Sequence, residues 1–398
     1  VGLLCRDNPM MMLAVSLAFT GPLLLPLGLQ GGGLHFRGIS SSGKTTLLTL
    51  AASVWGSREL ISHWRATSNG LEVIARRRTE MLLPLAEIAE IRPHDLNESV
   101  YMLANGSGKT RMTKDATLAD TARWRLALIS SGEISIEEKL REGRLTTKEG
   151  HDVRLLDIEA DSRRHGVFDV LHGANDAAAF SDEIRRVSQR FHGTAGPEFV
   201  RQLITRRMLA NVAGHNATIH ASAANWLASL PAPADGPTMR AARRFALIGH
   251  CGSLATELNL TGWSNGLAIT AAKEAFLAWY DNRYGDRLDS AKTVVAPLLQ
   301  FLNKNLASLT PMNAAGAQTT GNAPLGWRDD TRAYLPPETW STIFTGNLET
   351  SAATALLAVG ILAHGDNMRP MRKAPRAIPG RPRLYTVNVE RVMNFKAS

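Results

Sequence analysis

The stretch FRGISSSGKTTLLTLAASVWG, residues 36–56, decides the fold. Within it, residues 38–45 (GISSSGKT) fill the pattern G-x-x-x-x-G-K-[ST], between a predicted strand at 34–37 and a predicted helix at 45–55. Gly38 and Gly43 let the backbone turn tightly, so that its N–H groups and the helix N-terminus face a phosphate. Strand, loop and helix in this order predict a P-loop on a mainly parallel α/β sheet.

The loop also predicts its ligands. Lys44 is expected to reach the β- and γ-phosphates of ATP, and the Thr45 hydroxyl is expected to bind Mg²⁺. ATP and Mg²⁺ are therefore the predicted cofactors. The residues expected to bind the nucleotide are Gly38, Ser40, Ser41, Ser42, Gly43, Lys44, Thr45 and Thr46.

Hydrolysis of ATP needs acidic side chains at the end of a neighbouring strand, and residues 81–88 (MLLPLAEI) are the candidate. Glu87 is predicted to be the catalytic base and to lie beside Mg²⁺; the alternative is an exposed carboxylate with no chemical role. The position before it, where a metal-binding aspartate is expected, is Ala86. Pro84 removes one hydrogen-bond donor from the strand. One expectation is therefore that the protein binds ATP but hydrolyses it weakly or not at all.

Outside the loop, the pattern predicts an α/β part followed by helices. Two further strands are expected at 124–130 and 154–158, and a Pro-rich linker at 231–237. The helices are expected at 176–191, 197–209, 238–258, 267–284 and 286–305, before a loop at 311–324. Residues 335–389 predict helix, helix and two extended pieces. The predicted domains are 1–168, 169–290 and 291–398.

Composition agrees with an ordinary globular protein, at 44% hydrophobic and 20% charged residues. The net charge of +9 predicts an anionic partner. Cys5 and Cys251 form no disulfide framework, which suits the cytoplasm.

Residues 10–29 carry no charge, but Pro22 and Pro26 interrupt any helix there well short of the roughly 20 helical residues that span a bilayer. We expect a buried helix with an apolar loop there, and no membrane partner.

Several segments resemble one family: the uncharacterised domain that forms the C-terminal half of many phage, plasmid and genomic-island primase–helicase proteins. They are FRGISSSGKTTLLTLAASVWG, WRATSNGLE, YMLANGSGK, WRLALISSGE, VRLLDIEAD, HGTAGPEF and RRFALIGHCGSLATELNLTGW, in this order over nearly the whole chain. That family is similar to AAA+ helicases, and some members look like the minichromosome-maintenance replicative helicases, which work as hexameric rings. Its members usually carry Asp-Glu where this chain has Ala86 and Glu87.

The resemblance implies an α/β fold: a P-loop AAA+ core with a parallel sheet, an α-helical lid and a C-terminal winged-helix domain. It implies an ATP-driven DNA helicase or translocase for replication of a mobile element, acting as a hexameric ring in the family's manner, with ATP at subunit interfaces. Because of Ala86, the alternative is an ATP-binding oligomerisation module with little or no hydrolysis. The opening VGLLCRDNP has no initiating methionine, which predicts a missing N-terminal primase or DNA-loading domain.

The resemblance also assigns roles near the γ-phosphate. Ser131, and less surely Ser130, would be sensor one; the open alternative is that SSGE caps a helix, with Glu133 as the capping-box partner of Ser130. Arg154 would be the finger that reaches the ATP of the next subunit. Arg141 and Arg144 are the fallback choices, and a plain surface arginine is the alternative.

In the lid, the segment MRAARRFALIGH resembles the sensor-two helix. It would place Arg243, or failing that Arg244, against the nucleotide. Two arginines on a helix are also often simply solvated. Trp263 is expected to pack, and His215 and His220 lack the acidic companion that a metal site would need.

Two basic segments are candidates for DNA contact. In the insertion at 97–123, Asn97 would cap a short helix that ends at Asn105-Gly106, followed by two extended arms. The resemblance implies a hairpin that projects into the pore of a ring, where Lys109, Arg111 and Lys114 would grip the DNA backbone; a solvated face is the alternative. The tail carries Arg369, Arg372, Lys373, Arg376, Arg381 and Arg383. These predict non-specific phosphate contact, a subunit contact or a solubility feature.

Overall fold

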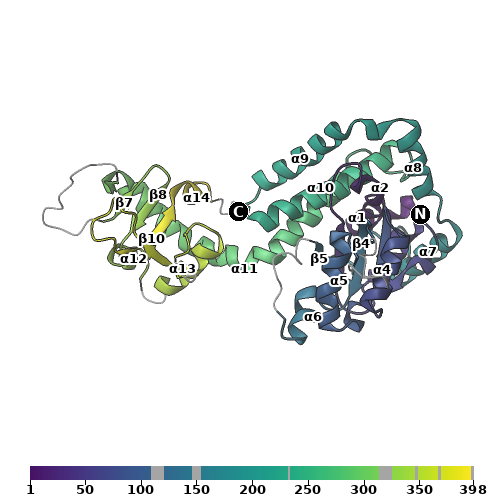
Figure 1. Cartoon of the computed structure of the whole chain (residues 1–398), viewed down its shortest axis with the longest axis horizontal. Helices are drawn as coiled ribbons and strands as arrows, with labels where there is room; N and C mark the ends of the chain where they lie inside the picture. The colour runs from purple at the N-terminus through teal and green to yellow at the C-terminus, as the bar shows by residue number, and fades with distance from the viewer. Residues whose placement is uncertain are drawn as a thin grey trace, which may run out of the picture. The chain divides into compact units, whose positions relative to one another are not determined.

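The structure is a computed structural model that describes residues 1–108, 121–145, 154–231, 234–312, 325–345, 348–365 and 369–395. The chain forms two compact units, one of residues 1–226 with 235–279 and one of residues 227–234 with 280–398 (Figure 1). The division into three domains at 168 and 290 is a different partition of the chain and stays a prediction.

A five-stranded parallel sheet organises the first unit, with the strand order β2-β3-β4-β1-β5. Its strands are β1 (Gly32–Arg37), β2 (Ser62–His63), β3 (Met81–Ala86), β4 (Leu126–Gly132) and β5 (Leu155–Glu159). The predicted strands at 34–37, 81–88, 124–130 and 154–158 are confirmed to within about two residues at each end. Strand β3 and the first half of β4 are short, nearly continuous apolar runs, as strands buried on both faces require.

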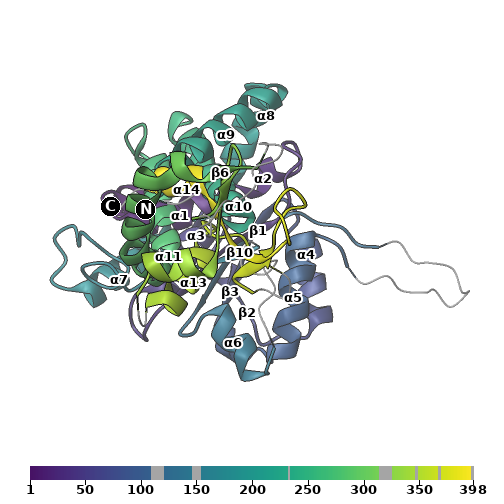
Figure 2. The ribbon, with the colours of Figure 1, turned by 90° about the vertical axis from the view of Figure 1, so that its left-hand side faces the viewer.

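Helices cover both faces of this sheet (Figure 2). Odd-numbered residues of β3 and even-numbered residues of β4 pack with α4 (Ser68–Arg77), α5 (Pro93–Asn105) and α6 (Ile136–Glu142). Strand side chains alternate between faces, so the others point to the opposite face, where α1 (Pro9–Ala18), α2 (Gly21–Leu24) and α3 (Lys44–Ser53) lie. The P-loop therefore opens toward the second face.

The helix at the start of the uncharged segment 10–29 is buried, as predicted, while Leu25 after α2 is 53% exposed. Nine of the ten residues of α1 are buried, all but its first, Pro9. The helix packs between the sheet and α10, where Gly252 brings the α10 backbone against Ser16. None of the helices in the described part of the chain is long and apolar enough to cross a membrane.

The helical part begins after β5. Its helices are α7 (Ala177–Arg190), α8 (Ala195–Thr205), α9 (Val212–Ala228), α10 (Gly236–Glu257) and α11 (Leu267–Asn305). Four match predicted helices, but two expectations were wrong. The sequence analysis missed α9, because its alanine-rich sequence has no strong apolar stripe. It also predicted a break near Gly285, whereas α11 continues through this position at the modest cost of one glycine.

The second unit contains another five-stranded sheet, in the order β6-β7-β8-β10-β9. Its strands are β6 (Thr310–Pro311), β7 (Trp327–Arg328), β8 (Arg332–Leu335), β9 (Met371–Lys373) and β10 (Arg383–Asn388), and its helices are α12 (Pro337–Ile343), α13 (Leu348–Ala358) and α14 (Val389–Met393). Trp340 stacks on Tyr385 at 4.0 Å between ring centroids in its core. The predicted order of two helices and two extended pieces is confirmed, and the winged-helix assignment stays a prediction.

Short 3-10 turns and two caps complete the description. The turns are η1 (Gly2–Cys5), η2 (Arg58–Leu60), η3 (Ile88–Glu90), η4 (Met208–Ala210) and η5 (Leu306–Ser308). The helix end at Gly106 is confirmed, with φ 71°, but Asn97 lies inside α5 and is not its cap, because Pro93 starts the helix one turn earlier. The SSGE cap is also wrong: Ser130 belongs to β4, and the capping box is Ser135 with Glu138.

Two buried histidines make the stability of the protein depend on pH. Burial lowers the pKa of His35 to about 4, and burial and the neighbouring His215 lower the pKa of His250 to about 4, both from 6.5. The unfolded chain binds more protons between these values, so stability is complete above pH 6.5 and falls as the pH drops toward 4. We expect a loss of about 3 kcal/mol for each histidine. Urea unfolding at pH 7 and pH 4.5 measures it, with exposed His63→Gln as the control that leaves the slope unchanged.

Candidate nucleotide site

The loop between β1 and α3 has the geometry of a phosphate-binding loop. Gly38 and Gly43 have φ angles of 159° and 99°, and Ser41 also lies in the left-handed region at 62°. Lys44 folds back over the loop, and its Nζ donates to Gly38 O at 2.8 Å and to Ile39 O at 2.5 Å. The ammonium group is thereby fixed on the first two carbonyl groups of the loop. This is where the sequence predicted the nucleotide phosphates.

The segment after β5 braces the loop from the other side. Asp161 Oδ2 accepts a hydrogen bond from Ile39 N at 2.7 Å, and Val167 N donates to Ser42 O at 2.9 Å. A Cβ on Gly38 would lie 2.7 Å from the Asp161 carboxyl carbon, and one on Gly43 would lie 2.6 Å from Val167. Both glycines are therefore required by their neighbours as well as by their φ angles.

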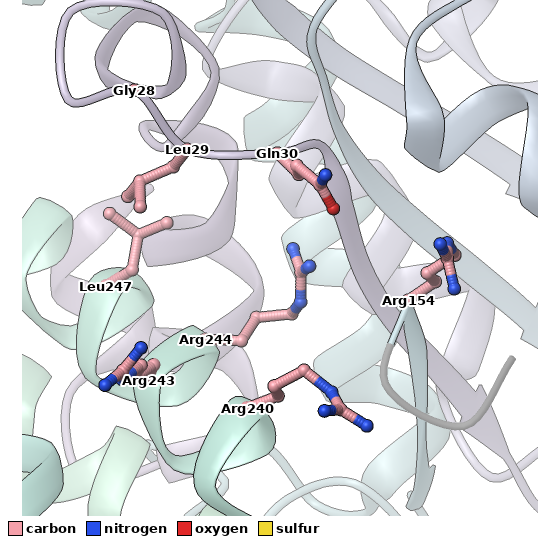
Figure 3. A pocket seen from close by; sticks show the side chains of 8 residues that line it. All are labelled: Gly28, Leu29, Gln30, Arg154, Arg240, Arg243, Arg244 and Leu247. Carbon is pink, nitrogen blue, oxygen red and sulfur yellow. The ribbon is translucent and has the colours of Figure 1, made fainter. Parts of the chain in front are cut away.

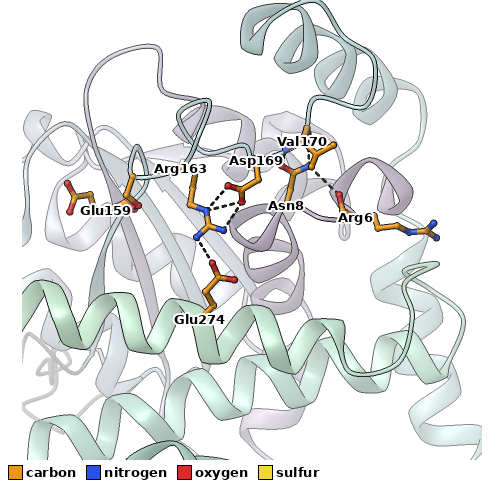
Figure 4. A network of polar contacts seen from close by, with 8 residues as sticks. Arg6, Asn8, Glu159, Arg163, Asp169, Val170 and Glu274 are labelled. Atoms are coloured by element: carbon orange, nitrogen blue, oxygen red, sulfur yellow. Dashed lines mark hydrogen bonds and ion pairs between the residues drawn. The ribbon is translucent and has the colours of Figure 1, made fainter. Parts of the chain in front are cut away.

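A polar network holds this bracing segment in place (Figure 4). Arg163 pairs with Asp169 at 2.7 Å and with Glu274 of α11 at 2.5 Å. Asn8, completely buried, accepts from the backbone N–H groups of Asp169 and Val170. The sequence analysis missed the whole segment. Its position directly after a parallel strand was the available signal, since binding residues gather at the carboxyl ends of such strands.

Three carboxylates act electrostatically on the P-loop lysine. Burial lowers the pKa of Lys44, and the charges of Glu133, Glu87 and Asp161 act against this shift. Lys44 is buried at 7% exposure, while Thr45 beside it is exposed. The start of α3 thus carries an ammonium group and, next to it, an exposed hydroxyl. A triphosphate with Mg²⁺ would complement this combination of one cation, one hydroxyl and nearby carboxylates.

The end of β3 has the unusual backbone that accompanies many functional sites. Glu87 follows the strand in the left-handed region, with φ 59° and ψ 69°, and its side chain is partly exposed. Such a conformation costs about 1 kcal/mol or more for a residue with a side chain, and it persists where the surroundings impose it. Ala86 before it is buried and belongs to the face of β3 that points toward α3.

The two sensor-one candidates lie on opposite faces of β4. Ser130 is part of a buried hydrogen-bond chain: Trp64 Nε1 donates to Ser130 Oγ at 2.8 Å, and the serine hydroxyl lies 2.9 Å from His35 Nδ1. His35 Nε2 lies 3.0 Å from Ile134 O and so donates to it. Ser131 points to the α3 face, and within the described residues its hydroxyl has no hydrogen-bond partner. Ser131 therefore has the hydroxyl that is available to a ligand.

This difference predicts opposite effects for alanine substitutions of these two neighbouring serines. Ser130→Ala leaves the N–H of Trp64 and the ring nitrogen of His35 without partners, which should cost about 2–4 kcal/mol of unfolding free energy. Ser131→Ala removes a hydroxyl that has no partner, so we expect stability within about 0.5 kcal/mol of wild type and weaker binding of ATP or slower hydrolysis. Urea unfolding and an ATP assay on both variants test this. Equal losses of stability would contradict the assignment.

The arginine candidates lie together, but away from the loop. Arg154 precedes β5, and its Nε donates to Asn105 Oδ1 at 3.0 Å. Arg244 Nη2 donates to Gly31 O at 3.0 Å, just before β1. With Arg240 and Arg243 they line one pocket (Figure 3). This pocket lies at the amino ends of β1 and β5, whereas the P-loop lies at their carboxyl ends. The structure does not bring Arg243 or Arg244 to the P-loop of their own chain.

The fallback residues lie on another part of the unit. Arg141 of α6 is exposed and pairs with Glu137 at 2.8 Å. Arg144 follows that helix with φ 55°. Trp263 is buried, and its Nε1 donates to Gly2 O at 2.8 Å; its packing between the lid and a winged helix stays a prediction. His215 lies 2.9 Å from His250 rather than beside an acid. No cluster of three or more His, Cys, Asp or Glu side chains able to hold a metal occurs among the described residues.

The candidate DNA contacts differ in how far they can be described. Lys109, Arg111 and Lys114 lie outside the described residues. Two residues that flank this segment are hydrogen-bonded to each other: Gly108 N donates to Ala122 O at 2.8 Å. In the second unit, β9 and β10 place Lys373 directly opposite Arg383. Like charges opposite each other are unfavourable in an isolated sheet, so this hairpin has an electrostatic preference for an anion.

Sheet, loop and helix define the class: an α/β protein with a phosphate-binding loop at the carboxyl edge of a parallel sheet. Residues 1–123 match the family described as Domain of unknown function (DUF927). None of the curated proteins matches the chain.

One similar solved structure is "SCCmec type IV Cch - active helicase", with 18% sequence identity and a TM-score of 0.56 over 98% of this chain and 69% of that chain. The likeness shows a shared fold.

Proposed function

We propose that the chain is the ATP-driven motor of a DNA helicase that replicates a mobile element. The P-loop binds ATP, Thr45 and Glu87 flank Mg²⁺, and Glu87 polarises the attacking water. The observation that carries the proposal is the loop geometry: Lys44, at the start of α3, is folded back onto the carbonyl groups of Gly38 and Ile39. The fold shared with a protein described as an active helicase supports the choice of helicase over other ATPases.

The proposed motor is an AAA+ ring of six subunits, by analogy with the family that the sequence resembles. Strand β1 lies between β4 and β5, and β4 lies between β1 and β3, so Ser131 and Glu87 end their strands on the same side of the P-loop. Arg154 and Arg243 line the pocket at the amino ends of β1 and β5, opposite the end at which the P-loop lies. If they contact ATP, they contact the ATP of a neighbouring subunit. Hydrolysis then depends on assembly, as an arginine supplied in trans requires.

DNA is the proposed track of this motor. Lys109, Arg111 and Lys114 are proposed to grip its backbone from the segment after α5, and the basic β9–β10 hairpin to add non-specific phosphate contacts. A helical lid after β5 and a winged-helix C-terminal domain are proposed for the rest of the chain.

The test is ATP hydrolysis with and without single-stranded DNA. We expect stimulation that declines steeply with salt, because each phosphate contact releases counterions. The triple variant Lys109→Ala, Arg111→Ala and Lys114→Ala should lose the stimulation and keep the basal rate. A variant of exposed, acid-paired arginines, Arg185→Ala with Arg186→Ala, is the control. A basal rate that DNA leaves unchanged at low salt would contradict the motor function.

A second function is favoured by one specific residue. Ala86 stands where the metal-side carboxylate is expected, and it is 6% exposed on the face toward α3. An ATP-binding oligomerisation module would bind ATP and assemble without turning it over. The two functions separate in a single assay, because the module binds ATP as tightly as the motor does but releases no phosphate above background.

A further inference from the structure

The arginine pocket of the first unit has the properties of an anion site in its own right. It is a cavity of about 480 Å³, which lies within the usual size range of small-molecule sites. Arg240, Arg243, Arg244 and Leu247 reach it from one face of α10, because residues three, four and seven apart share a face of a helix. Arg154 and the segment 28–30 close the other side. In Figure 3, Arg244 points toward Gln30 and Arg240 toward the side of Arg154.

Three of the charges in this cavity are not balanced by the described residues. None of the described residues that line it is acidic. Elsewhere in the described chain arginines pair with carboxylates, as Arg163, Arg186 and Arg201 do. Arg240, Arg243 and Arg244 make no ion pair within the described residues. Three guanidinium groups on one face of α10 repel one another, so the arrangement favours the entry of an anion.

Arg244 is the most constrained of the four. Its Nη2 is fixed on Gly31 O, while its Nε is buried and has no hydrogen-bond partner in the described part of the chain. Burial and the nearby charge of Arg154 lower the pKa of Arg244 to about 10. A buried donor without a partner costs about 1–3 kcal/mol. A fold that tolerates this cost at a cavity is organised for a ligand and not for its own stability.

We propose that this pocket binds the phosphate groups of an oligophosphate, at a site separate from the P-loop. Guanidinium groups suit phosphate because their planar forks match two of its oxygens at once. One strand length, roughly 20 Å for six residues, separates the amino end of β1 from its carboxyl end. The inferred ligand is a free oligophosphate. A nucleotide on the P-loop of a second copy, which the proposed function already includes for Arg154 and Arg243, is the other outcome of the test, and only that outcome rests on the proposed function.

The first arm of the test uses tripolyphosphate and the full chain carrying Lys44→Ala, which removes the main phosphate contact of the P-loop. We expect calorimetric binding that weakens at least about tenfold with Arg240→Ala, the energy of one charge-assisted hydrogen bond. Arg185→Ala, an exposed arginine paired with Asp182, should leave binding within twofold. This arm does not involve ATP at the P-loop, so its outcome is independent of the proposed motor.

A second variant gives a readout that a purely structural arginine would not give. Arg244→Met removes the desolvated charge, so we expect a melting temperature a few degrees above that of wild type without anions. Added tripolyphosphate should then raise the melting temperature of wild type but not that of the variant. A structural arginine would instead give a variant that melts lower in both conditions, which would overturn the proposal.

The remaining arm distinguishes the source of the phosphate. If Lys44→Ala protein does not bind tripolyphosphate, wild-type protein with ATP should assemble in sedimentation experiments, and Arg240→Ala should prevent this assembly. That result assigns the pocket to a nucleotide on a second copy. Tripolyphosphate binding that depends on Arg240 assigns it to a free ligand. Absence of both effects overturns the anion site.

Discussion

Replacing Ala86 with aspartate is expected to raise the rate of ATP hydrolysis about 100-fold, because a metal-side carboxylate contributes about 3 kcal/mol to transition-state stabilisation. Ala86 is the last residue of β3, and its Cβ points to the face on which α3 and Thr45 lie. An aspartate there would extend toward the Mg²⁺ that Thr45 is proposed to bind. Glu87 follows it directly in the sequence.

The matched control is Ala86→Asn, which has the same size and no charge. It should leave the rate near that of wild type. Without metal, the aspartate is a buried carboxylate, so Ala86→Asp should melt lower than Ala86→Asn in EDTA and recover in Mg²⁺ with ATP. Equal rates for the aspartate and asparagine variants would favour the non-hydrolysing module. Adding Glu87→Gln to Ala86→Asp should abolish the gain.

The second large effect is expected for the proposed finger. In the Ala86→Asp background, Arg154→Ala should lower turnover about 1,000-fold or more, the range that fingers supplied in trans reach. Arg154 lies at the amino end of β5, away from the P-loop of its own chain. It can therefore act only on the ATP that a neighbouring subunit binds. Binding of ATP should be almost unchanged, because the P-loop contacts remain.

Mixing two inactive proteins tests whether the arginine acts in trans. Arg154→Ala subunits bind ATP but lack the finger, and Lys44→Ala subunits have the finger but bind no ATP. Both should be inactive alone and regain part of the activity when mixed. Arg141→Ala, an exposed arginine paired with Glu137, is the control and should remain active. A mixture as inactive as its parts would contradict the role in trans.

Local patterns predicted the elements that make the phosphate loop. Residues 38–45 and the apolar runs at β1, β3, β4 and β5 each follow from neighbours in sequence. Helix α9 was missed because its alanine-rich sequence lacks a clear apolar stripe. The continuity of α11 was missed because a glycine and charged residues near 285 also suit a helix end.

What could not be predicted depends on contacts between distant residues. Asp161 reaches Ile39 across 122 positions, and Ser130 reaches Trp64 across 66 and His35 across 95. The spacing in the sequence carries no sign of these pairs. The same is true of Arg154 and Arg244, which were assigned to different nucleotides but share one cavity. The separate roles of Ser130 and Ser131 emerged only when the faces of β4 were known.

The central claim is that Lys44 and the loop amides hold a nucleoside triphosphate. Equilibrium binding of labelled ATP to wild-type protein and to Lys44→Ala, with and without Mg²⁺, measures it directly. The account predicts one saturable site per chain that Lys44→Ala weakens about 100-fold, the energy of two charge-assisted hydrogen bonds to phosphate. Wild-type protein that binds no ATP at any Mg²⁺ concentration, or binds it as well without the Lys44 ammonium group, would contradict it.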